Sequence, residues 1–196
     1  MGPVGRPREF TESEVLDRAL ETFWARGYEG TSVQDLVDAT GLSRASLYGA
    51  FGDKDKLFAR VLGHYGARAA SLAGELQQGP SVRAAVERYL LRSLDAAFGP
   101  RDGEPRGCFL QLAAAECQPS HPGVVQAAAE AGRRGEQALR EALRRGKKSG
   151  ELPTTLDDKG VARLLAITMQ GASLAARNGR TREELREVVR QAMKLL

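Results

Sequence analysis

A short segment near residue 45 combines a long cation, small hydroxyl side chains and a phenol. Such groups can donate hydrogen bonds to base edges or phosphate oxygens, and small neighbours let them approach without a bulky chain intervening. The chemistry that these residue types favour is therefore contact with DNA. The segment supplies Ser43, Arg44, Ala45, Ser46, Tyr48 and Gly49.

Other candidate DNA contacts flank this segment. Lys54 begins a helix whose first backbone N–H groups and positive dipole end attract a phosphate. Arg6 and Arg8, in the stretch GRPRE, form a basic arm that can enter a minor groove. The helix before the segment contributes Thr31, Ser32 and Gln34.

Most of these candidates also have a purely structural interpretation, which the sequence leaves open. Ser43 can serve only as a helix N-cap, and Tyr48 can be half-buried packing. Arg44 can be a solvated surface arginine. Lys54 can pair with a nearby carboxylate, although an exposed pair contributes only about 0 to 1 kcal/mol. The basic arm can be a disordered tail that contacts nothing.

Two helices must position the segment. Hydroxyl caps at residues 31–32 begin a helix that Gly41 ends, because a residue without a Cβ can adopt the left-handed conformation of a sharp turn. Ser43 then caps a short helix whose Leu47 and Phe51 point inward. This spacing is typical of a helix-turn-helix, which can lay its second helix in a major groove about 12 Å wide.

The rest of the chain predicts an all-α protein, because apolar residues recur at helical spacing and no convincing stretch alternates as a strand does. We expect a helix-turn-helix domain over 1–53 and a helical regulatory and dimerisation domain over 54–196. Gly63, Gly66 and Gly74 indicate close helix packing or a bend. Besides the two helices above, we expect helices over residues 12–25, 54–77, 81–98, 108–117, 124–148, 157–178 and 181–196.

Composition limits the class of protein. Of the 196 residues, 42% are hydrophobic and 28% charged, as in an ordinary soluble globular protein. No apolar run approaches the roughly 18 to 20 residues of a membrane span, and no apolar core of a secretory signal follows the N-terminal arginines. We therefore expect a cytoplasmic protein without a membrane partner.

Charge is unevenly distributed along the chain. The net charge is +4, but residues 1–56 carry 7 Lys/Arg against 10 Asp/Glu, a net −3, while residues 57–196 carry 22 against 15, a net +7. Attraction to phosphate depends on the arrangement of charge within a Debye length of about 8 to 10 Å. DNA binding by the N-terminal part therefore requires its few cations to be concentrated on one face.

The sequence carries no signal for catalysis, a cofactor or a metal. It has no HExxH, GxSxG or GxxxxGK[ST] motif, so we expect neither an enzyme nor a bound cofactor. His64 and His121 lack the spacing of metal ligands. Cys108 and Cys117, on one helix, lie about 13 Å apart along its axis, too far for a disulfide. Buried apolar cysteine is the default, and thiol sensing is the alternative.

The run GYEGTSVQDLVDATGLSRASLYGAFGDKDKLF, residues 27–58, resembles the DNA-binding signature of TetR-type transcriptional repressors. The shared features are a first helix ending in Gly-Tyr, a Thr-Ser helix entry, a Gly-Leu-Ser turn, a Leu-Tyr recognition helix, and Phe, Lys and Leu-Phe at the opening of the fourth helix. The sequence departs from that signature at Val37 and at residues 49–50. The resemblance covers about residues 10–60 and implies a repressor that a small-molecule inducer releases from its operator.

Dimerisation is expected from the last two helices. One helix-turn-helix binds a half-site weakly, and two-fold pairing places two recognition helices about 34 Å apart on a palindromic operator. The apolar stripes of these helices suit a four-helix seam across a two-fold axis, although they can instead face the core of their own subunit. The dimer residues that we predict are Leu164, Ile167, Gly171, Leu185, Val188, Val189 and Ala192.

An inducer pocket is implied by the resemblance. The middle helices carry apolar and aromatic residues of the kind that line small-molecule sites, and core packing is the alternative for each of them. The inducer would be small and apolar or amphipathic. The ligand-binding residues that we predict are Tyr65, Tyr89, Leu94, Phe98, Phe109, Leu112, Cys117 and Met169.

A second function stays open at this point. A helical protein–protein adaptor could keep the helix-turn-helix fold without binding an operator, and the net negative charge of residues 1–56 makes that worth testing. Salt dependence separates the two hypotheses, because a DNA binder loses affinity steeply as salt rises.

Overall fold

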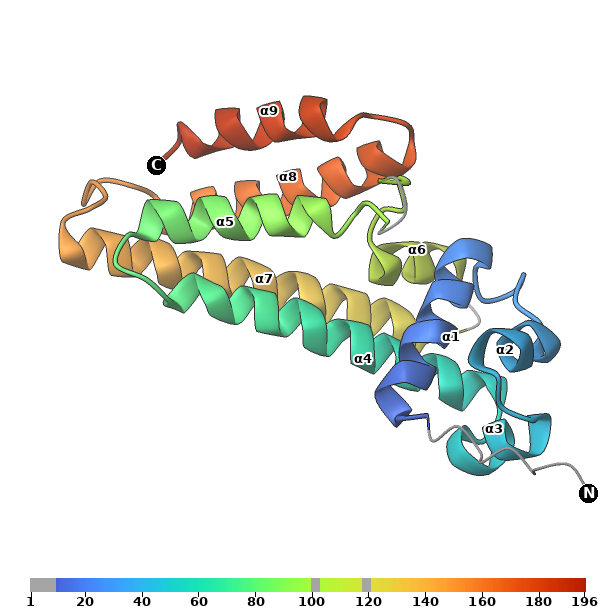
Figure 1. Ribbon diagram of the computed structural model, residues 1–196. Coiled ribbons are helices and arrows are strands. Elements are labelled where there is room, and N and C mark those ends of the chain that lie inside the picture. Colours follow the sequence, from blue (N-terminus) through green and yellow to red (C-terminus); the bar gives the residue numbers. More distant parts are fainter. Residues whose placement is uncertain (1–9, 100–102, 118–120) are drawn as a thin grey trace, which may run out of the picture. The chain divides into compact units, whose positions relative to one another are not determined.

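The computed structural model describes residues 10–99, 103–117 and 121–196, and these segments confirm the all-α prediction (Figure 1). Their only β structure is an isolated bridge between Phe98 and Pro105. No helix within them is long and apolar enough to cross a membrane. The elements are α1 (Glu12–Arg26), α2 (Val33–Thr40), α3 (Arg44–Phe51), α4 (Lys54–Gly74), a 3-10 helix η1 (Glu75–Gln77), α5 (Val82–Asp95), α6 (Phe109–Glu116), α7 (Pro122–Ser149), α8 (Asp158–Arg177) and α9 (Arg182–Met193).

The chain divides into two compact units, residues 1–64 and 65–196. The division falls inside α4 rather than before it, because the first turns of α4 pack within the first unit. There the ring of Phe58 lies 4.9 Å from that of Phe23 and 4.7 Å from that of Tyr28, measured between ring centres. One continuous helix therefore contributes to both units.

Local sequence signals define the helix ends of the first unit. Thr11 and Glu14 form a capping box at α1, as their spacing predicts, and a second box closes the start of α2. Gly41 ends α2 with φ 74°, in the left-handed region, and turns the chain sharply toward α3. The buried apolar residues of this unit include Val15, Leu20, Phe23, Leu36, Leu47, Phe51, Leu57 and Val61.

Helices α5, α7, α8 and α9 build the core of the second unit (Figure 1). α7 packs against α5, α6 and α8, and α5 also packs against α8 and α9. Their inward faces meet in one apolar cluster, as the helical spacing of the stripes requires. It includes Val86, Leu90, Leu94, Leu139, Leu143, Leu165, Leu185 and Val189.

The glycines of α4 do not show the close packing that was one of their two predicted roles. Among the described residues, no heavy atom lies within 4 Å of the position that a Cβ would take at Gly63, Gly66 or Gly74. A side chain would fit at each of them. Close packing among the described residues therefore does not explain these three glycines.

Candidate nucleic-acid interface

α3 is held to the first unit along one apolar edge. Ser43 caps the helix, and its hydroxyl accepts a hydrogen bond from the Ser46 backbone N–H at 3.1 Å. Leu47 and Phe51, one turn apart, are both buried, and α2 packs against the helix. The opposite side of α3 is thereby left on the surface.

The outward side of α3 carries one positive charge and no acidic group. Arg44 is exposed, and within the described segments its guanidinium makes no hydrogen bond or ion pair. The Tyr48 side chain is also accessible, at 41% exposure. Ala45, Ser46 and Gly49 complete this exposed surface. The residues predicted to contact bases from α3 are therefore all accessible on a short helix.

The hydroxyls of this region are also engaged inside the unit. The hydroxyl of Ser43, which caps α3, also lies 2.9 Å from the hydroxyl of Ser46. The Ser32 hydroxyl donates to the Asp35 carboxylate at 2.6 Å as part of the α2 capping box. Gln34 is exposed on the first turn of α2. Contact of these side chains with DNA remains a proposal.

Thr31 does not lie at the surface. Its side chain is buried at 1% exposure, and its hydroxyl donates to the Gly27 carbonyl at 2.6 Å. A side chain enclosed in this way cannot meet a base or a phosphate, so the prediction that Thr31 contacts DNA is wrong. Thr31 instead stabilises the turn between α1 and α2.

Lys54 is positioned at the start of α4 by an aromatic ring. Its amino group lies 4.2 Å from the centre of the Tyr28 ring, a cation–π arrangement, and the Tyr28 hydroxyl donates to the Asp55 carboxylate. The ammonium group is thus held close to the end of a helix that attracts anions. Arg6 and Arg8, the predicted basic arm, lie outside the described residues.

The negative charge of the first 56 residues does not fall on α3. The pKa of Asp35 is held below its ordinary value, chiefly by hydrogen bonds from Ser32. Several carboxylates are compensated within the first unit, whereas the cation of Arg44 is not. The ion pairs concerned are Glu12–Arg60, Asp35–Arg26 and, at 3.3 Å, Asp53–Lys56.

The second unit contains a cavity of about 580 Å³ lined by α4, α5, α6, α7 and α8. Three of the predicted ligand residues, Tyr65, Tyr89 and Met169, line it, and Cys108 joins them. Both the volume and the lining suit a small, mostly apolar ligand. Small and aliphatic residues form much of the remaining wall, including Ala69, Leu72, Ala97, Leu110, Ala128, Ala131, Gly132, Gly135 and Ala166.

The polar groups of this cavity include two phenols that stay uncharged and one cation, Arg133. The Tyr65 hydroxyl donates to Cys108 Sγ at 3.6 Å. Burial raises the pKa of Tyr65 well above its ordinary value and also raises that of Tyr89, so both phenols stay neutral at physiological pH. The carboxylate of Glu136 already pairs with Arg163 at 3.2 Å.

Five of the predicted ligand residues lie outside the cavity wall. Leu94, Phe109 and Cys117 are packed at 1 to 3% exposure, and Leu112 is half-buried away from the wall. Phe98 lines a different hollow. For Leu94, Phe109 and Cys117 the core-packing alternative holds, because an apolar side chain can fill the space beside it as readily as border a cavity.

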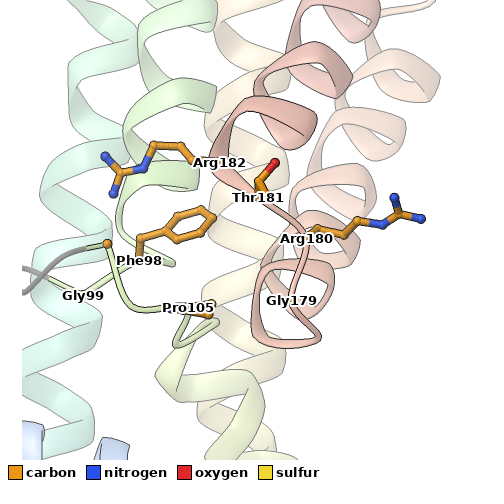
Figure 2. A pocket seen from close by; sticks show the side chains of 8 residues that line it. Phe98, Gly99, Pro105, Gly179, Arg180, Thr181 and Arg182 are labelled. Carbon is orange, nitrogen blue, oxygen red and sulfur yellow. The ribbon is translucent and has the colours of Figure 1, made fainter.

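The second hollow, of about 740 Å³, lies between the end of α5 and the turn from α8 to α9 (Figure 2). Arg180 and Arg182 line it together with Phe98, and the Arg182 guanidinium carbon lies 4.9 Å from the centre of the Phe98 ring. Arg182 also pairs with Asp95 at 3.5 Å. This cationic lining does not suit an apolar ligand.

An apolar surface on α8 and α9 is uncovered in the single chain. Among the predicted dimer residues, Leu164, Ile167 and Val188 are 50%, 58% and 39% exposed. Leu174 and Leu195, which were not predicted to lie at the interface, are 54% and 43% exposed. We call these five residues the α8–α9 apolar face. Large apolar side chains gathered on a surface mark an interaction site.

The remaining dimer predictions divide between surface and core. Leu185 and Val189 are 3% and 1% exposed and belong to the apolar cluster of their own unit. The prediction that they form a dimer interface is therefore wrong. Gly171 is exposed and Ala192 is half-buried.

No group of three His, Cys, Asp or Glu side chains in the described parts of the chain could hold a metal ion. Cys108 and Cys117 lie at the two ends of α6, and neither forms a disulfide. Cys117 is buried and Cys108 is half-buried at the cavity wall.

Both units resemble proteins of one kind. Residues 15–61 match the family described as bacterial regulatory proteins, tetR family, and residues 82–193 match the tetracyclin repressor-like C-terminal domain. The HTH-type transcriptional repressor ComR of Escherichia coli (strain K12) is 32% identical over 193 residues, which are 97% of this chain and 91% of the relative. The uncharacterized HTH-type transcriptional regulator YezE of Bacillus subtilis (strain 168) is 33% identical over 76% of each chain.

Solved structures show the same fold. A cysteine mutant of the TetR family transcriptional regulator CifR, complexed with 26-bp double-strand operator DNA, matches with a TM-score of 0.82 and 35% identity over 96% of this chain and 98% of that one. The reduced form of NemR from Escherichia coli matches with a TM-score of 0.79 at 22% identity, a likeness of fold alone.

Proposed function

The chain belongs to the TetR family of bacterial regulatory proteins, and from that premise we propose that it is a repressor that binds a palindromic operator as a dimer. As a member of this family it is a DNA-binding transcriptional regulator. Its action would take place in the cytoplasm, where bacterial operators lie. A small ligand in the cavity of the second unit would release it from DNA.

The outward side of α3 carries this proposal. α3 is a short helix of the kind that the major groove admits. It has no acidic residue, and its one cation, Arg44, has no partner in the described segments. An arginine in that position can donate to the O6 and N7 atoms of a guanine. Tyr48 and Lys54 would contact phosphates and set the register of the helix.

Selection of bound sites from a random duplex library tests operator binding directly. We expect a palindrome whose half-site centres are about 34 Å apart, the spacing of two recognition helices related by a two-fold axis. Failure to enrich any sequence would contradict the proposal.

Arg44→Ala tests the role assigned to α3. Loss of a base contact of this kind should weaken operator binding by about 1 to 3 kcal/mol, roughly 5- to 150-fold. Arg134→Ala is a matched control, because Arg134 is an exposed arginine of α7 and its loss changes the net charge equally. Wild-type affinity in Arg44→Ala, measured by gel retardation with the dimer intact, would remove α3 as the recognition helix.

The protein–protein adaptor remains the competing hypothesis. A salt titration of binding to random duplex separates the two. For a regulator that contacts several phosphates, the logarithm of the association constant should fall linearly with the logarithm of the salt concentration. An adaptor would show no affinity for duplex even at low salt.

The dimer would form through the α8–α9 apolar face. Exposed leucine and isoleucine on α8, with exposed valine on α9 and leucine just after it, suit a four-helix seam with the same surface of a second copy. Exposed Gly171 lies on α8 between Ile167 and Leu174 in the sequence, and its lack of a side chain would permit close helix approach.

The ligand would act on the DNA-binding unit through α4. Tyr65, Ala69 and Leu72 of this helix line the cavity, while Leu57 and Phe58 of the same helix are buried. A ligand can shift the equilibrium between the DNA-bound and the released state only by the difference in its binding free energy for the two. A change in their ratio from 99:1 to 1:99 needs a difference of about 5.5 kcal/mol.

A thermal-shift screen of small, neutral, mostly apolar compounds, followed by operator-release assays, tests the ligand site. Ala128→Trp places a large side chain on the cavity wall, so it should abolish release by any compound found while operator binding stays intact. Ala115→Trp, at an exposed site of α6 outside the wall, is the control. A full response in Ala128→Trp would show that the ligand binds elsewhere.

A further inference from the structure

Gly49 is the outermost residue of α3. Successive helical residues differ by about 100° around the axis. The buried pair Leu47 and Phe51 defines the inner side, and Gly49 lies about 180° from the midpoint of that pair. Its neighbours on the outer side, Ala45 and Ser46, are also short. Anything that docks on α3 would therefore come closest to the backbone at Gly49.

Nothing within the described chain accounts for a glycine at this position. No heavy atom there lies within 4 Å of the Cβ position of Gly49, and its backbone does not adopt the left-handed conformation that favours glycine. Glycine is less favourable than alanine in a helix interior. The missing side chain thus weakens α3 without serving packing among the described residues, and it leaves the backbone open to a close contact on the outer side.

We propose that Gly49 is a specificity-determining residue of the DNA interface, at which the α3 backbone touches base edges directly and packs against the 5-methyl group of a thymine. The inference rests on the proposed function. At residues 45 and 49 the helix offers only a methyl group and backbone Cα–H, which can neither donate nor accept a strong hydrogen bond. The thymine methyl is the apolar group that the base pairs present in the major groove.

The rest of α3 fits this close approach. Arg44 and Tyr48, the two long exposed side chains of α3, lie about 40° apart on one flank of the helix, about 140° and 100° from Gly49 around the axis. They can extend past the point of closest contact to a guanine edge or a phosphate. A side chain at residue 49 would hold the helix away from the bases and lengthen those contacts as well.

Gly49→Ala tests the inference, and Gly63→Ala is its matched control. Gly63 is likewise exposed, helical and free of neighbours within 4 Å of its Cβ position, but it lies in α4. Both variants should melt at a higher temperature than the wild type, because alanine favours a helix. Only Gly49→Ala should bind the selected operator more weakly, by about tenfold, from the added methyl group at the contact.

The outcomes distinguish this inference from the proposed function. If the wild type binds no duplex, the proposed function fails. If the wild type binds its operator and Gly49→Ala binds it equally well, only the inference is overturned.

A second measurement uses the wild-type protein and altered DNA. Each thymine of the selected half-site is replaced in turn by uracil, which lacks only the 5-methyl group. At least one replacement should weaken binding several-fold, and the same replacement should have little further effect on Gly49→Ala. Unchanged affinity for every uracil-substituted operator would overturn the thymine assignment.

Discussion

Gly146 lies in α7 at a point where the helix meets two buried side chains. A Cβ at this position would lie 2.7 Å from Leu152 Cδ1 and 3.2 Å from Val82 Cγ1. Leu152 and Val82 are only 2% and 3% exposed, so neither can move aside without disturbing the core of the second unit. Because residue 146 is a glycine, α7 can pack directly against Leu152 and Val82. At Gly49, by contrast, the space that a side chain would take is unoccupied.

We predict that Gly146→Ala destabilises the protein although alanine favours a helix. Overpacking of this kind costs about 1 to 3 kcal/mol, which exceeds the gain of up to about 1 kcal/mol in helix propensity. Urea denaturation measures the difference in the free energy of unfolding. Gly66→Ala in α4, where no neighbour lies within 4 Å of the Cβ position, should instead be slightly more stable than the wild type. Equal or higher stability of Gly146→Ala would contradict the packing argument.

At the scale of elements, the start of α5 is stabilised by a carboxylate from a distant part of the chain. Glu151, in the turn after α7, accepts hydrogen bonds from the backbone N–H groups of Val82 and Arg83 at 2.7 and 2.9 Å and from the Ser81 hydroxyl at 2.7 Å. The backbone donors, Arg83 first, lower the pKa of Glu151 below its ordinary value of 4.5. A negative charge at this end also complements the helix dipole.

Glu151→Gln should therefore lower the free energy of unfolding at pH 7 by roughly 0.5 to 2 kcal/mol, the range for loss of a helix cap. Because the folded pKa lies below 4.5, the contribution of Glu151 is fully present above about pH 4.5 and is lost as the pH falls through the folded pKa. The difference between the two proteins should shrink accordingly in acid denaturation series. Glu141→Gln, on the exposed side of α7, is the control. A difference that stays constant down to pH 3 would argue against the carboxylate as the cap.

At the scale of the whole molecule, the proposed sites for DNA recognition and ligand binding belong to different units, and α4 contributes residues to both units. The first unit presents α3, and the second contains both the cavity and the α8–α9 apolar face. Ile167 belongs to the apolar face and also lines the cavity. In the proposed dimer, the ligand site would therefore lie next to the interface between subunits.

Leu174→Glu tests the proposed dimer without altering the cavity wall, because Leu174 is 54% exposed and does not line the cavity. A charge in the seam should convert the dimer to a monomer in size-exclusion chromatography with light scattering. Operator affinity should fall with it, since a monomer binds one half-site only. Ala115→Glu adds the same charge on the exposed surface of α6 and should leave the dimer intact. A dimeric Leu174→Glu at the same concentration would exclude this face as the interface.

The sequence by itself determined the helices and the helix-turn-helix, while α5 and α9 end three residues before the predicted 98 and 196. The capping box at Thr11 and the turn at Gly41 follow from residues within four positions of one another, and such interactions need no distant partner. The spacing of Leu47 and Phe51 likewise identified the inner side of α3. Local chemistry was sufficient for these features.

Only the tertiary structure decided which apolar residues face a core, a cavity or the surface. In α9, Leu185 is buried and Val188 is exposed, although both belong to one stripe. The cavity is bordered by residues from five helices, many of them alanines and glycines, and Leu94, predicted to line it, is packed in the core. The physical reason is that helical periodicity fixes the direction of each side chain around its own axis. What lies in that direction depends on neighbours that are distant in sequence, and a cavity is the space that their packing leaves unfilled.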